Sequence, residues 1–397
     1  LVVADSVDMR GRKLDRPIFV HGVRFRGRVD LRDVTIHGSV ELTACVFEEE
    51  LRLDDAEIEG SLRLERISAD RLSMNGIVVR GRLDLSGCKT VAPITLFDAS
   101  VDGFVDLRSV SSPAVRMRGA HIRSDLRIGC TSEAGSGPSQ LGLVDASNAR
   151  IEGRVSVDGA GYGKPRPTPE VSQPLTAADV EDSFCWSAAD IASAHGLSLL
   201  LTSAKLGGSL QVMAFYSQTS HYDCSRETQV PTVMPQTTIV WSVLDRLDLS
   251  NADIAGDVTL WGTLVKVGIN AVGVRVRGQF RLVPGELFVA DRDQSDWCCR
   301  QTVVIRSDKV FGNAISMDGS RIEGHIQMSG VSVQGNLDLS NSILGGYMWV
   351  GGYHLRTESD KGYDVVIPTT IEGNLMLFLS TLMNAVELLG VDRKSTR

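Results

Sequence analysis

The sequence lacks the short motifs that mark most nucleotide-dependent enzymes. It contains no G-x-x-x-x-G-K-[ST] phosphate-binding loop, and no G-x-G-x-x-G follows an expected strand and opens a helix. A nicotinamide or flavin site of the doubly wound type is therefore unsupported. The 39 glycines need a different explanation.

The chain also has no excess of positive charge and no cysteine pattern typical of disulfide pairing. Lys and Arg number 41 against 49 Asp and Glu, a net charge of −8, so direct nucleic-acid binding is not expected. The seven cysteines are an odd number and widely spaced, which favours a reduced, cytoplasmic setting. Cys45 and Cys88 fall at small core positions of the repeat described below, so we expect buried thiols there.

The most apolar run, 374–391, is interrupted by Asn384 and Glu387 and is too short to be identified as a membrane span. A final strand accounts for its first third. A capping helix and the approach to a membrane element both remain open for the rest, so association with a membrane in a longer protein stays possible. Leu1 is not an initiator methionine, and 392–397 (DRKSTR) matches a translated sequencing-library adapter, so we expect a fragment with an artefactual tail.

What the chain has is a repeat. Phe25, Ile36, Phe47 and Ile58 step by 11, and the apolar or small positions between them are separated by gaps of 2, 3, 2 and 4. A gap of 2 puts both side chains on one face of an extended segment, and a gap of 3 or 4 spans a corner. Four such sides fill 22 residues, which predicts one coil of a four-sided β-solenoid.

Copies of the template run from near residue 18 to near 379, which predicts roughly fourteen coils in a single domain over 1–391. Glycines recur at the longer corner, where we expect them to adopt positive φ. They stand at positions 27, 38, 60, 81 and 103.

The core pairs identify a resemblance. Ala56-Glu57-Ile58, Ala149-Arg150-Ile151, Ala204-Lys205-Leu206 and Ala252-Asp253-Ile254 are similar to the small-x-large pairs of pentapeptide-repeat proteins, although here one residue is added at alternate corners. The resemblance implies an all-β, right-handed parallel, quadrilateral β-helix. The pattern more closely resembles bacterial proteins labelled membrane-associated oxidoreductase, but no catalytic residue and no cofactor can be matched through it.

Five insertions interrupt the repeat, and we expect them to leave at corners. If they gather on one flank, that flank is the expected functional surface. They lie near 131–140, 159–190, 216–236, 284–311 and 351–368. Within the second, Thr176–Gly196 shows an N-cap pair and a glycine stop, so a short helix before a strand that starts at Ile191 is expected.

Aromatic residues in the insertions are the candidate binding residues, because Tyr or Trp on a loop suits contact with a partner or a sugar ring. They are Tyr162, Tyr216, Tyr222, Trp297, Tyr353 and Tyr363. A zinc site is a weaker hypothesis, since its donors match no usual spacing and no metal is expected. Those donors are His221, Cys224, Cys298 and Cys299.

Carboxylates at outward repeat positions could supply paired acids for general acid–base catalysis. Asp30, Glu41, Asp84, Asp106 and Asp248 hold such positions, but outward arginines are mixed among them, so we interpret them as a solvated face of alternating charge.

Three functions remain. The first is a non-catalytic scaffold that binds a protein or surface partner through the insertions. The second is a membrane-associated oxidoreductase, which the resemblance alone implies. The third is nucleic-acid mimicry toward a DNA-binding enzyme, which requires a continuous acidic stripe. No small-molecule substrate can be identified from the sequence.

Overall fold

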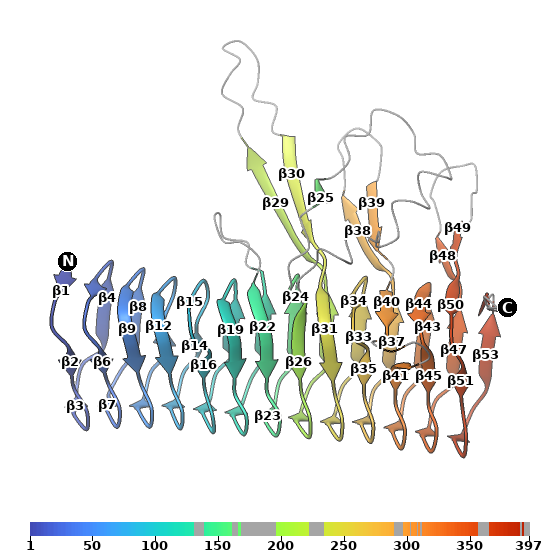
Figure 1. Ribbon diagram of the computed structural model, residues 1–397, viewed down its shortest axis with the longest axis horizontal. Helices are drawn as coiled ribbons and strands as arrows, with labels where there is room; N and C mark the ends of the chain where they lie inside the picture. The colour runs from blue at the N-terminus through green and yellow to red at the C-terminus, as the bar shows by residue number, and fades with distance from the viewer. Residues whose placement is uncertain are drawn as a thin grey trace, which may run out of the picture.

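The computed structural model describes residues 1–130, 139–160, 166–167, 196–221, 234–289, 297–301, 303–307, 309, 312–355, 365–389 and 391–392. These residues form a right-handed parallel β-solenoid whose coils stack from the N-terminal end to the C-terminal end (Figure 1). The described residues contain strands and turns but no helix. Accordingly, none of them forms a helix of the length and apolar character that crossing a bilayer would require.

Three long parallel sheets build the wall of the solenoid. Sheet A has 21 strands, and sheets B and C have 13 strands each among the described residues, so the solenoid has thirteen coils, one fewer than expected. Sheet A covers two of the four sides, because β9 (Val46–Arg52) pairs with both β5 (Arg24–Phe25) and β6 (Val29–Asp30).

Each coil contributes one short strand to sheet B. These strands are β3 (Lys13–Leu14), β7 (Thr35–Ile36), β10 (Glu57–Ile58), β13 (Val78–Val79), β17 (Ser100–Val101), β20 (His121–Ile122), β23 (Arg150–Ile151), β27 (Lys205–Leu206), β32 (Asp253–Ile254), β36 (Arg275–Val276), β42 (Arg321–Ile322), β46 (Ile343–Leu344) and β52 (Thr381–Leu382).

Each coil then turns into sheet C. Its strands are β4 (Ile18–His21), β8 (Val40–Thr43), β11 (Leu62–Arg63), β14 (Leu83–Asp84), β18 (Val105–Arg108), β21 (Leu126–Gly129), β24 (Val155–Asp158), β28 (Leu210–Met213), β33 (Val258–Trp261), β37 (Phe280–Val283), β43 (Ile326–Ser329), β47 (Met348–Gly351) and β53 (Val386–Leu389).

The remaining solenoid strands belong to sheet A. Besides β5, β6 and β9 they are β1 (Val2–Val3), β2 (Val7–Asp8), β12 (Ser68–Ser73), β15 (Lys89–Thr90), β16 (Ile94–Thr95), β19 (Ser111–Arg116), β22 (Gln140–Asp145), β26 (Leu197–Leu200), β31 (Val243–Asp248), β34 (Leu264–Val265), β35 (Ile269–Asn270), β40 (Val303–Arg306), β41 (Asn313–Ser316), β44 (Val331–Gln334), β45 (Asn336–Asp338), β50 (Thr369–Ile371), β51 (Leu375–Met376) and β54 (Val391–Asp392).

The core is a column of stacked apolar side chains. In sheet C, Leu62 pairs in register with Val40 on one side and Leu83 on the other, 22 and 21 residues away, and all three are fully buried. Cys45 and Cys88 are buried free thiols in the same column, as expected. The predicted alternation of inward positions is therefore confirmed, because each coil buries its apolar face only against its neighbours.

Of the five glycines predicted to adopt positive φ, only Gly38 does (φ 151°), and most positive-φ residues lie at other corners. The corner from sheet A to sheet B holds one such residue in every coil, as at Asp55 (φ 56°), where the Ala56 N–H donates to the Leu53 carbonyl at 3.2 Å. Gly60 lies instead at the corner from sheet B to sheet C and is not among the positive-φ residues. A Cβ there would lie 2.6 Å from the Gly38 carbonyl carbon of the neighbouring coil. Gly60 is thus required for close approach, not for φ.

The apolar run 374–391 was expected to leave the solenoid after its first third. Instead it forms the last described coil, with β51, β52 and β53 in the three sheets. Phe378, Leu379 and Met383 are 70%, 73% and 64% exposed because no described coil stacks beyond them.

Candidate interaction surface

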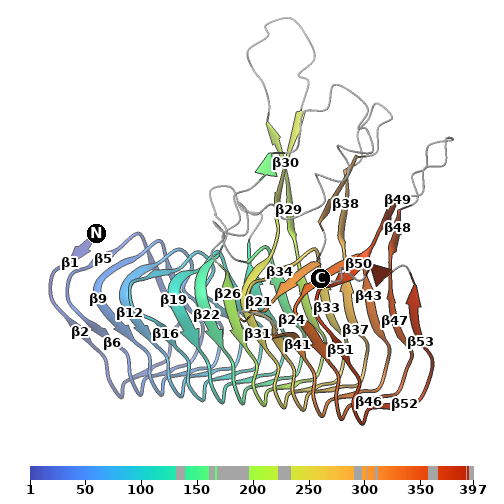
Figure 2. The same cartoon turned by 45° about the vertical axis from the view of Figure 1, so that its right-hand side comes forward.

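All five insertions leave the solenoid at the same corner, which we call the insertion corner: the turn from a sheet C strand into sheet A. The connections that carry them run from β21 to β22, β24 to β26, β28 to β31, β37 to β40 and β47 to β50. Figures 1 and 2 show the three hairpins that follow β28, β37 and β47 projecting from one side of the rod. The expectation that the insertions share one flank is therefore met by the described backbone.

Paired strands form the described part of these insertions. They are β29 (Phe215–His221), β30 (Met234–Val240), β38 (Gly285–Val289), β39 (Trp297–Gln301), β48 (Tyr353–Leu355), β49 (Val365–Ile367) and β25 (Arg166–Pro167). Each hairpin is antiparallel, and β25 pairs with β30, so two insertions from successive coils share one small sheet. We call these seven strands the crest.

The register of the coils explains how hairpins can be inserted without disturbing the solenoid. In sheets C and A, Leu210 pairs with Val258 and Val243 with Leu264, so Ala214 and Ser242 occupy the places of Gly262 and Thr263 in the next coil. The hairpin between them begins with the pair Phe215 and Val240, which brings its two ends together. A hairpin can therefore be added at this corner without shifting the pairing of the following coil.

The candidate aromatic residues divide between the crest and undescribed segments. Tyr216 lies on β29 opposite Ile239, and Trp297 lies on β39 opposite Val289. Tyr353 begins β48, is half-buried, and packs at the base of its hairpin, where its Cβ lies 3.0 Å from the position a Cβ on Gly330 would take. Tyr162, Tyr222 and Tyr363 lie outside the described residues, as do the short helix expected between Thr176 and Ile191 and the start of the strand expected at Ile191.

The weak zinc candidates fall on two different hairpins. His221 ends β29, while Cys298 and Cys299 lie on β39 opposite Phe288 and Leu287. Cys224 lies outside the described residues. In the part of the chain that the structure describes, no three His, Cys, Asp or Glu side chains gather in a metal-binding arrangement.

The insertion expected at 284–311 is not continuous. Val303–Arg306 returns to sheet A as β40, with Val303 and Ile305 fully buried. The segment 307–312, of which 307, 309 and 312 are described, then separates β40 from β41. Within the sequence VVIR, Val303 and Ile305 have the spacing of two residues that is typical of a core strand. VVIR is only four residues long, and the sequences on both sides do not fit the repeat, so the repeat pattern does not reveal it.

The outward carboxylates are paired, and several are buried, which corrects the expectation of a solvated face. Asp30, Asp106 and Asp248 are 1%, 2% and 7% exposed, and Asp84 is 8% exposed. Each carboxylate lies against an arginine or hydroxyl two residues away along the chain, and these neighbours cover it. The partners are Arg32 for Asp30, Ser86 for Asp84, Arg108 for Asp106, and Arg246 with Ser250 for Asp248.

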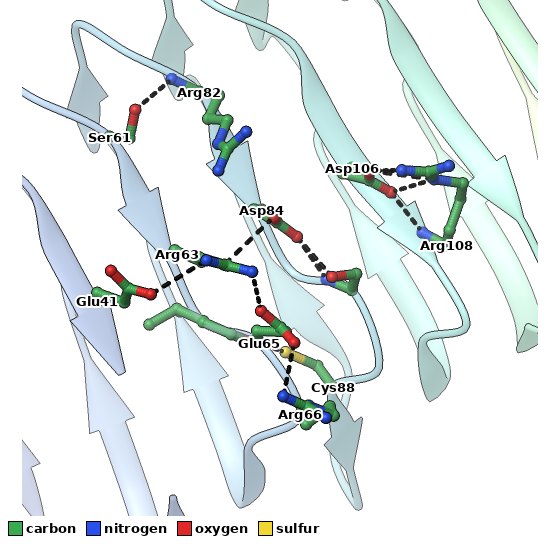
Figure 3. A network of polar contacts seen from close by, with 12 residues as sticks. Glu41, Ser61, Arg63, Glu65, Arg66, Arg82, Asp84, Cys88, Asp106 and Arg108 are labelled. Carbon is green, nitrogen blue, oxygen red and sulfur yellow. Dashed lines mark hydrogen bonds and ion pairs between the residues drawn. The ribbon is translucent and has the colours of Figure 1, made fainter. Parts of the chain in front are cut away.

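The largest such cluster surrounds Arg63 on sheet C. Figure 3 shows its guanidinium between Glu41, Glu65 and Asp84, with Nη1 3.1 Å from Glu41 Oε1 and Nε 3.8 Å from Asp84 Oδ2. Arg66 also pairs with Glu65 at 2.9 Å. Burial lowers the pKa of Arg63, but the three carboxylates together raise it by more than burial lowers it. The net pKa of Arg63 is therefore raised. With every acid paired to an arginine, the cluster acts as a structural clamp between coils rather than as a catalytic dyad.

The pKa values of Asp145, which is buried, and Asp158, which is half-buried, shift in opposite directions. Burial raises the pKa of Asp145, but hydrogen bonds from Ser147 and Arg118 lower it more, so the net pKa is lowered. Burial also raises the pKa of Asp158, and here the charges of Arg108 and Arg154 and a hydrogen bond from Ser156 lower it by less, so the net pKa is raised. Asp158 ends β24, immediately before the insertion corner.

These shifts predict opposite pH dependences for two matched substitutions. The folded pKa of Asp145 lies below its unfolded value of about 3.9, so its stabilisation is present above that pH and is lost as the pH falls. Asp145→Asn should lower the free energy of unfolding by about 1 kcal/mol at pH 7, and the deficit should shrink as the pH falls below the unfolded pKa of about 3.9. The folded pKa of Asp158 is raised, so its ionisation costs stability as the pH rises through that pKa, and Asp158→Asn should stabilise at pH 7.

Thermal unfolding of both variants and the parent between about pH 3 and pH 7 measures these effects. The parent profile serves as the control for all other titrating groups. Equal, pH-independent losses in both variants would contradict the assigned directions.

Sheet B presents charges of both signs. A shallow groove of about 490 Å³ on this face is lined by Arg150, Glu152, Lys205, Asp253 and Arg277 among others. Arg150 pairs with Glu152 at 3.1 Å and Arg277 with Asp253 at 3.2 Å. This alternation gives sheet B no continuous acidic stripe, which nucleic-acid mimicry would require.

No protein-family model matches this chain, and no curated protein matches it. What the structure shares with the pentapeptide-repeat resemblance is the stacked, all-strand solenoid.

Proposed function

We propose that this protein is a non-catalytic solenoid scaffold that binds a protein or surface partner through the crest. The observation that carries the proposal is that all five insertions leave at one corner while the other corners keep short turns, apart from the segment at 307–312. A folding requirement would not select one corner, because a hairpin can be added at any turn that leaves the next coil in register. Loops gathered on one side of a rigid body are the usual place for binding.

The backbone of the crest suits such a role. In the small sheet ordered β25-β30-β29, strand β29 is an edge among the described residues, and edge strands offer unpaired N–H and C=O groups to an added strand. The rod beneath is rigid because its core column is continuous over thirteen coils. Tyr216 on β29 and Trp297 on β39 are the first aromatic residues to substitute within the crest.

Deletion of 215–241 tests the proposal. It joins Ala214 to Ser242 and so recreates the uninterrupted corner Trp261-Gly262-Thr263-Leu264 of the next coil, at a position where Ala44 already has φ 52°. We expect a folded rod whose thermal unfolding midpoint is within a few degrees of the parent. Partners retained by the immobilised parent chain, or binding to anionic vesicles, should be lost by at least tenfold.

The deletion of 353–368, which joins Gly352 to Thr369 in the same way, removes the last crest hairpin and shows which part of the crest each partner contacts. The proposal fails if the rod that lacks 215–241 and the rod that lacks both hairpins retain every interaction of the parent. Circular dichroism and gel filtration establish that each rod is folded before binding is compared.

A redox enzyme is the competing proposal, and it rests on the resemblance to proteins labelled membrane-associated oxidoreductase. It differs from the scaffold in one measurable property, because flavin, haem and iron–sulfur groups absorb visible light. A stoichiometric chromophore or redox metal in the purified chain would replace the scaffold proposal.

A further inference from the structure

A second groove, of about 580 Å³, lies on the outer face of sheet C at the C-terminal end of the described solenoid. Its lining residues lie on β43, β47 and β53 and on the turns that lead into β37, β43, β47 and β53, four adjacent strands of sheet C (Figure 1). Its volume is in the range of pockets that hold small organic ligands. The lining residues are Gln279, His325, Gln327, Tyr347, Trp349, Asn384, Ala385 and Glu387.

Aromatic rings form a platform in this groove. Tyr347 and Trp349 flank Met348, which is buried, so both aromatic side chains point outward from β47. The imidazole of His325 on the preceding coil stacks on the Tyr347 ring, with centroids 3.8 Å apart and planes 21° apart. Tyr347 is 47% exposed despite this contact.

The stacked pair is held in place by the backbone. The Tyr347 N–H donates to His325 Nδ1 at 3.2 Å, so the proton of the neutral imidazole lies on Nε2. Gly346 makes this possible, because a Cβ on that residue would lie 2.3 Å from His325 Nδ1. The platform is therefore rigid before any ligand arrives.

The fold does not require Trp349. Phe19 holds the equivalent outward position of sheet C in the first coil and Glu41 in the second, and polar residues hold it in every coil from Arg63 to Gln327. Trp349 pairs directly with Gln327 and Glu387 in the two adjacent strands. These earlier residues are Arg63, Asp84, Asp106, Arg127, Ser156, Gln211, Thr259, Arg281 and Gln327. A large aromatic ring at a position that polar residues hold in every coil from Glu41 to Gln327 favours a ligand contact at Trp349.

Planar amides surround the platform. Arg281 Nε donates to Gln327 Oε1 at 3.3 Å, and Gln327 Nε2 donates to Ser329 Oγ at 3.2 Å, which fixes the orientation of this amide. Asn384 is held by a hydrogen bond from its Nδ2 to the Gly345 carbonyl at 2.8 Å. Amides both donate and accept, as the hydroxyls of a sugar do.

The groove favours a neutral ligand over an organic cation. Glu387 is the one carboxylate among its lining residues, and the Arg281 guanidinium sits beside Gln327. A cation site would need aromatic rings on several sides and more negative charge, whereas this platform is open. The C–H face of a pyranose ring can stack on Trp349 or Tyr347 while its hydroxyls reach the amides and Glu387.

We propose that this groove is a binding site for a neutral saccharide, with a pyranose ring stacked on Trp349 and Tyr347. The site is independent of the crest, since none of its lining residues belongs to an insertion. A rod without the hairpins should therefore retain it.

Affinity electrophoresis in gels that contain hydroxyethyl cellulose, xyloglucan, soluble starch or dextran tests the proposal, followed by fluorescence titration with the hexasaccharide of the best polymer. At least one polymer should retard the parent protein, and the hexasaccharide should change the fluorescence of Trp349. Trp349→Ala should weaken binding about tenfold or more, because the stacking contact is lost.

Trp261→Ala is the matched control, since Trp261 also points outward from sheet C but lies outside the groove. It should leave the affinity unchanged. If Trp349→Ala does not fold, Glu387→Gln and Gln327→Ala take its place, each with an expected loss of about threefold to tenfold. The proposal is overturned if no polymer retards the parent, if both tryptophan variants bind equally, or if tetramethylammonium or a single-stranded oligonucleotide binds where the saccharides do not.

Discussion

Gly60→Ala is expected to lower the free energy of unfolding by about 3 kcal/mol, near the upper end of the range for overpacking. The added Cβ would lie 2.4 Å from Ser39 Oγ and 2.6 Å from both the Ser39 nitrogen and the Gly38 carbonyl carbon. A hydroxyl can rotate away, but the backbone of the neighbouring coil cannot move without breaking the register between Val40 and Leu62. Urea unfolding followed by circular dichroism measures the loss.

Gly22→Ala provides the control, because Gly22 has φ 65° but no atom within 4 Å of its missing Cβ. It occupies the corner position that Ala44 holds in the next coil, with φ 52°. We expect a loss of about 1 kcal/mol, the cost of the left-handed conformation alone. If the Gly22 variant lost more stability than the Gly60 variant, positive φ and not close approach would be the main reason for glycine in this solenoid.

Arg63→Ala should cost about 2 kcal/mol, because Glu65 and Asp84 lose their shared cation and keep only Arg66 and Ser86, respectively, as partners. Glu65 and Asp84 are only 5% and 8% exposed, and both face the Arg63 guanidinium. Removing one member of a buried ionic group is more destructive than removing the whole group, since the remaining charges stay desolvated. The same urea experiment, with Glu65→Gln added to the arginine variant, should recover part of the loss.

Arg80→Ala is the comparison for Arg63. Arg80 lies 3.4 Å from Glu57 and 3.8 Å from Asp102, but its side chain is 48% exposed. We expect a change below about 1 kcal/mol, as for ordinary surface ion pairs. Equal losses for the two arginines would show that burial of the acids around Arg63 has no energetic consequence.

The crest and the saccharide groove divide the molecule into two independent surfaces. The crest rises from the insertion corner, whereas the groove lies on the flat outer face of sheet C. A scaffold that also held a neutral glycan would fix its partner near that surface, so loss of one interaction need not affect the other. Deleting 215–241 and substituting Trp349 therefore separate the two proposals.

The predictions that rested on coil periodicity are the ones that the structure confirms. Ile36 and Ile58 are fully buried because inward positions depend only on the spacing of residues within one coil. The same spacing placed Cys45 and Cys88 in the core. The coil count, thirteen among the described residues where roughly fourteen are expected, was close for the same reason. The same spacing did not reveal the core strand at Val303–Arg306 within 284–311.

The role of glycine and the state of the carboxylates could not be obtained in this way. Whether Gly60 needs positive φ or close approach depends on the distance to Gly38 in the neighbouring coil, which no pattern within one coil records. Asp30 and Asp106 were expected to be solvated because they point outward. They are buried because Arg32 and Arg108 fold over them.

The sequence by itself determined the solenoid, since an apolar spacing of two residues separated by corners can be satisfied only by extended sides around a shared core. The tertiary structure alone decided that five insertions share one corner and that Tyr347, Trp349, Gln327 and Glu387 line one groove. These residues come from coils separated in the chain by 22 to 38 residues. They meet because the parallel strands of successive coils stay in register even where an insertion separates the coils in the sequence.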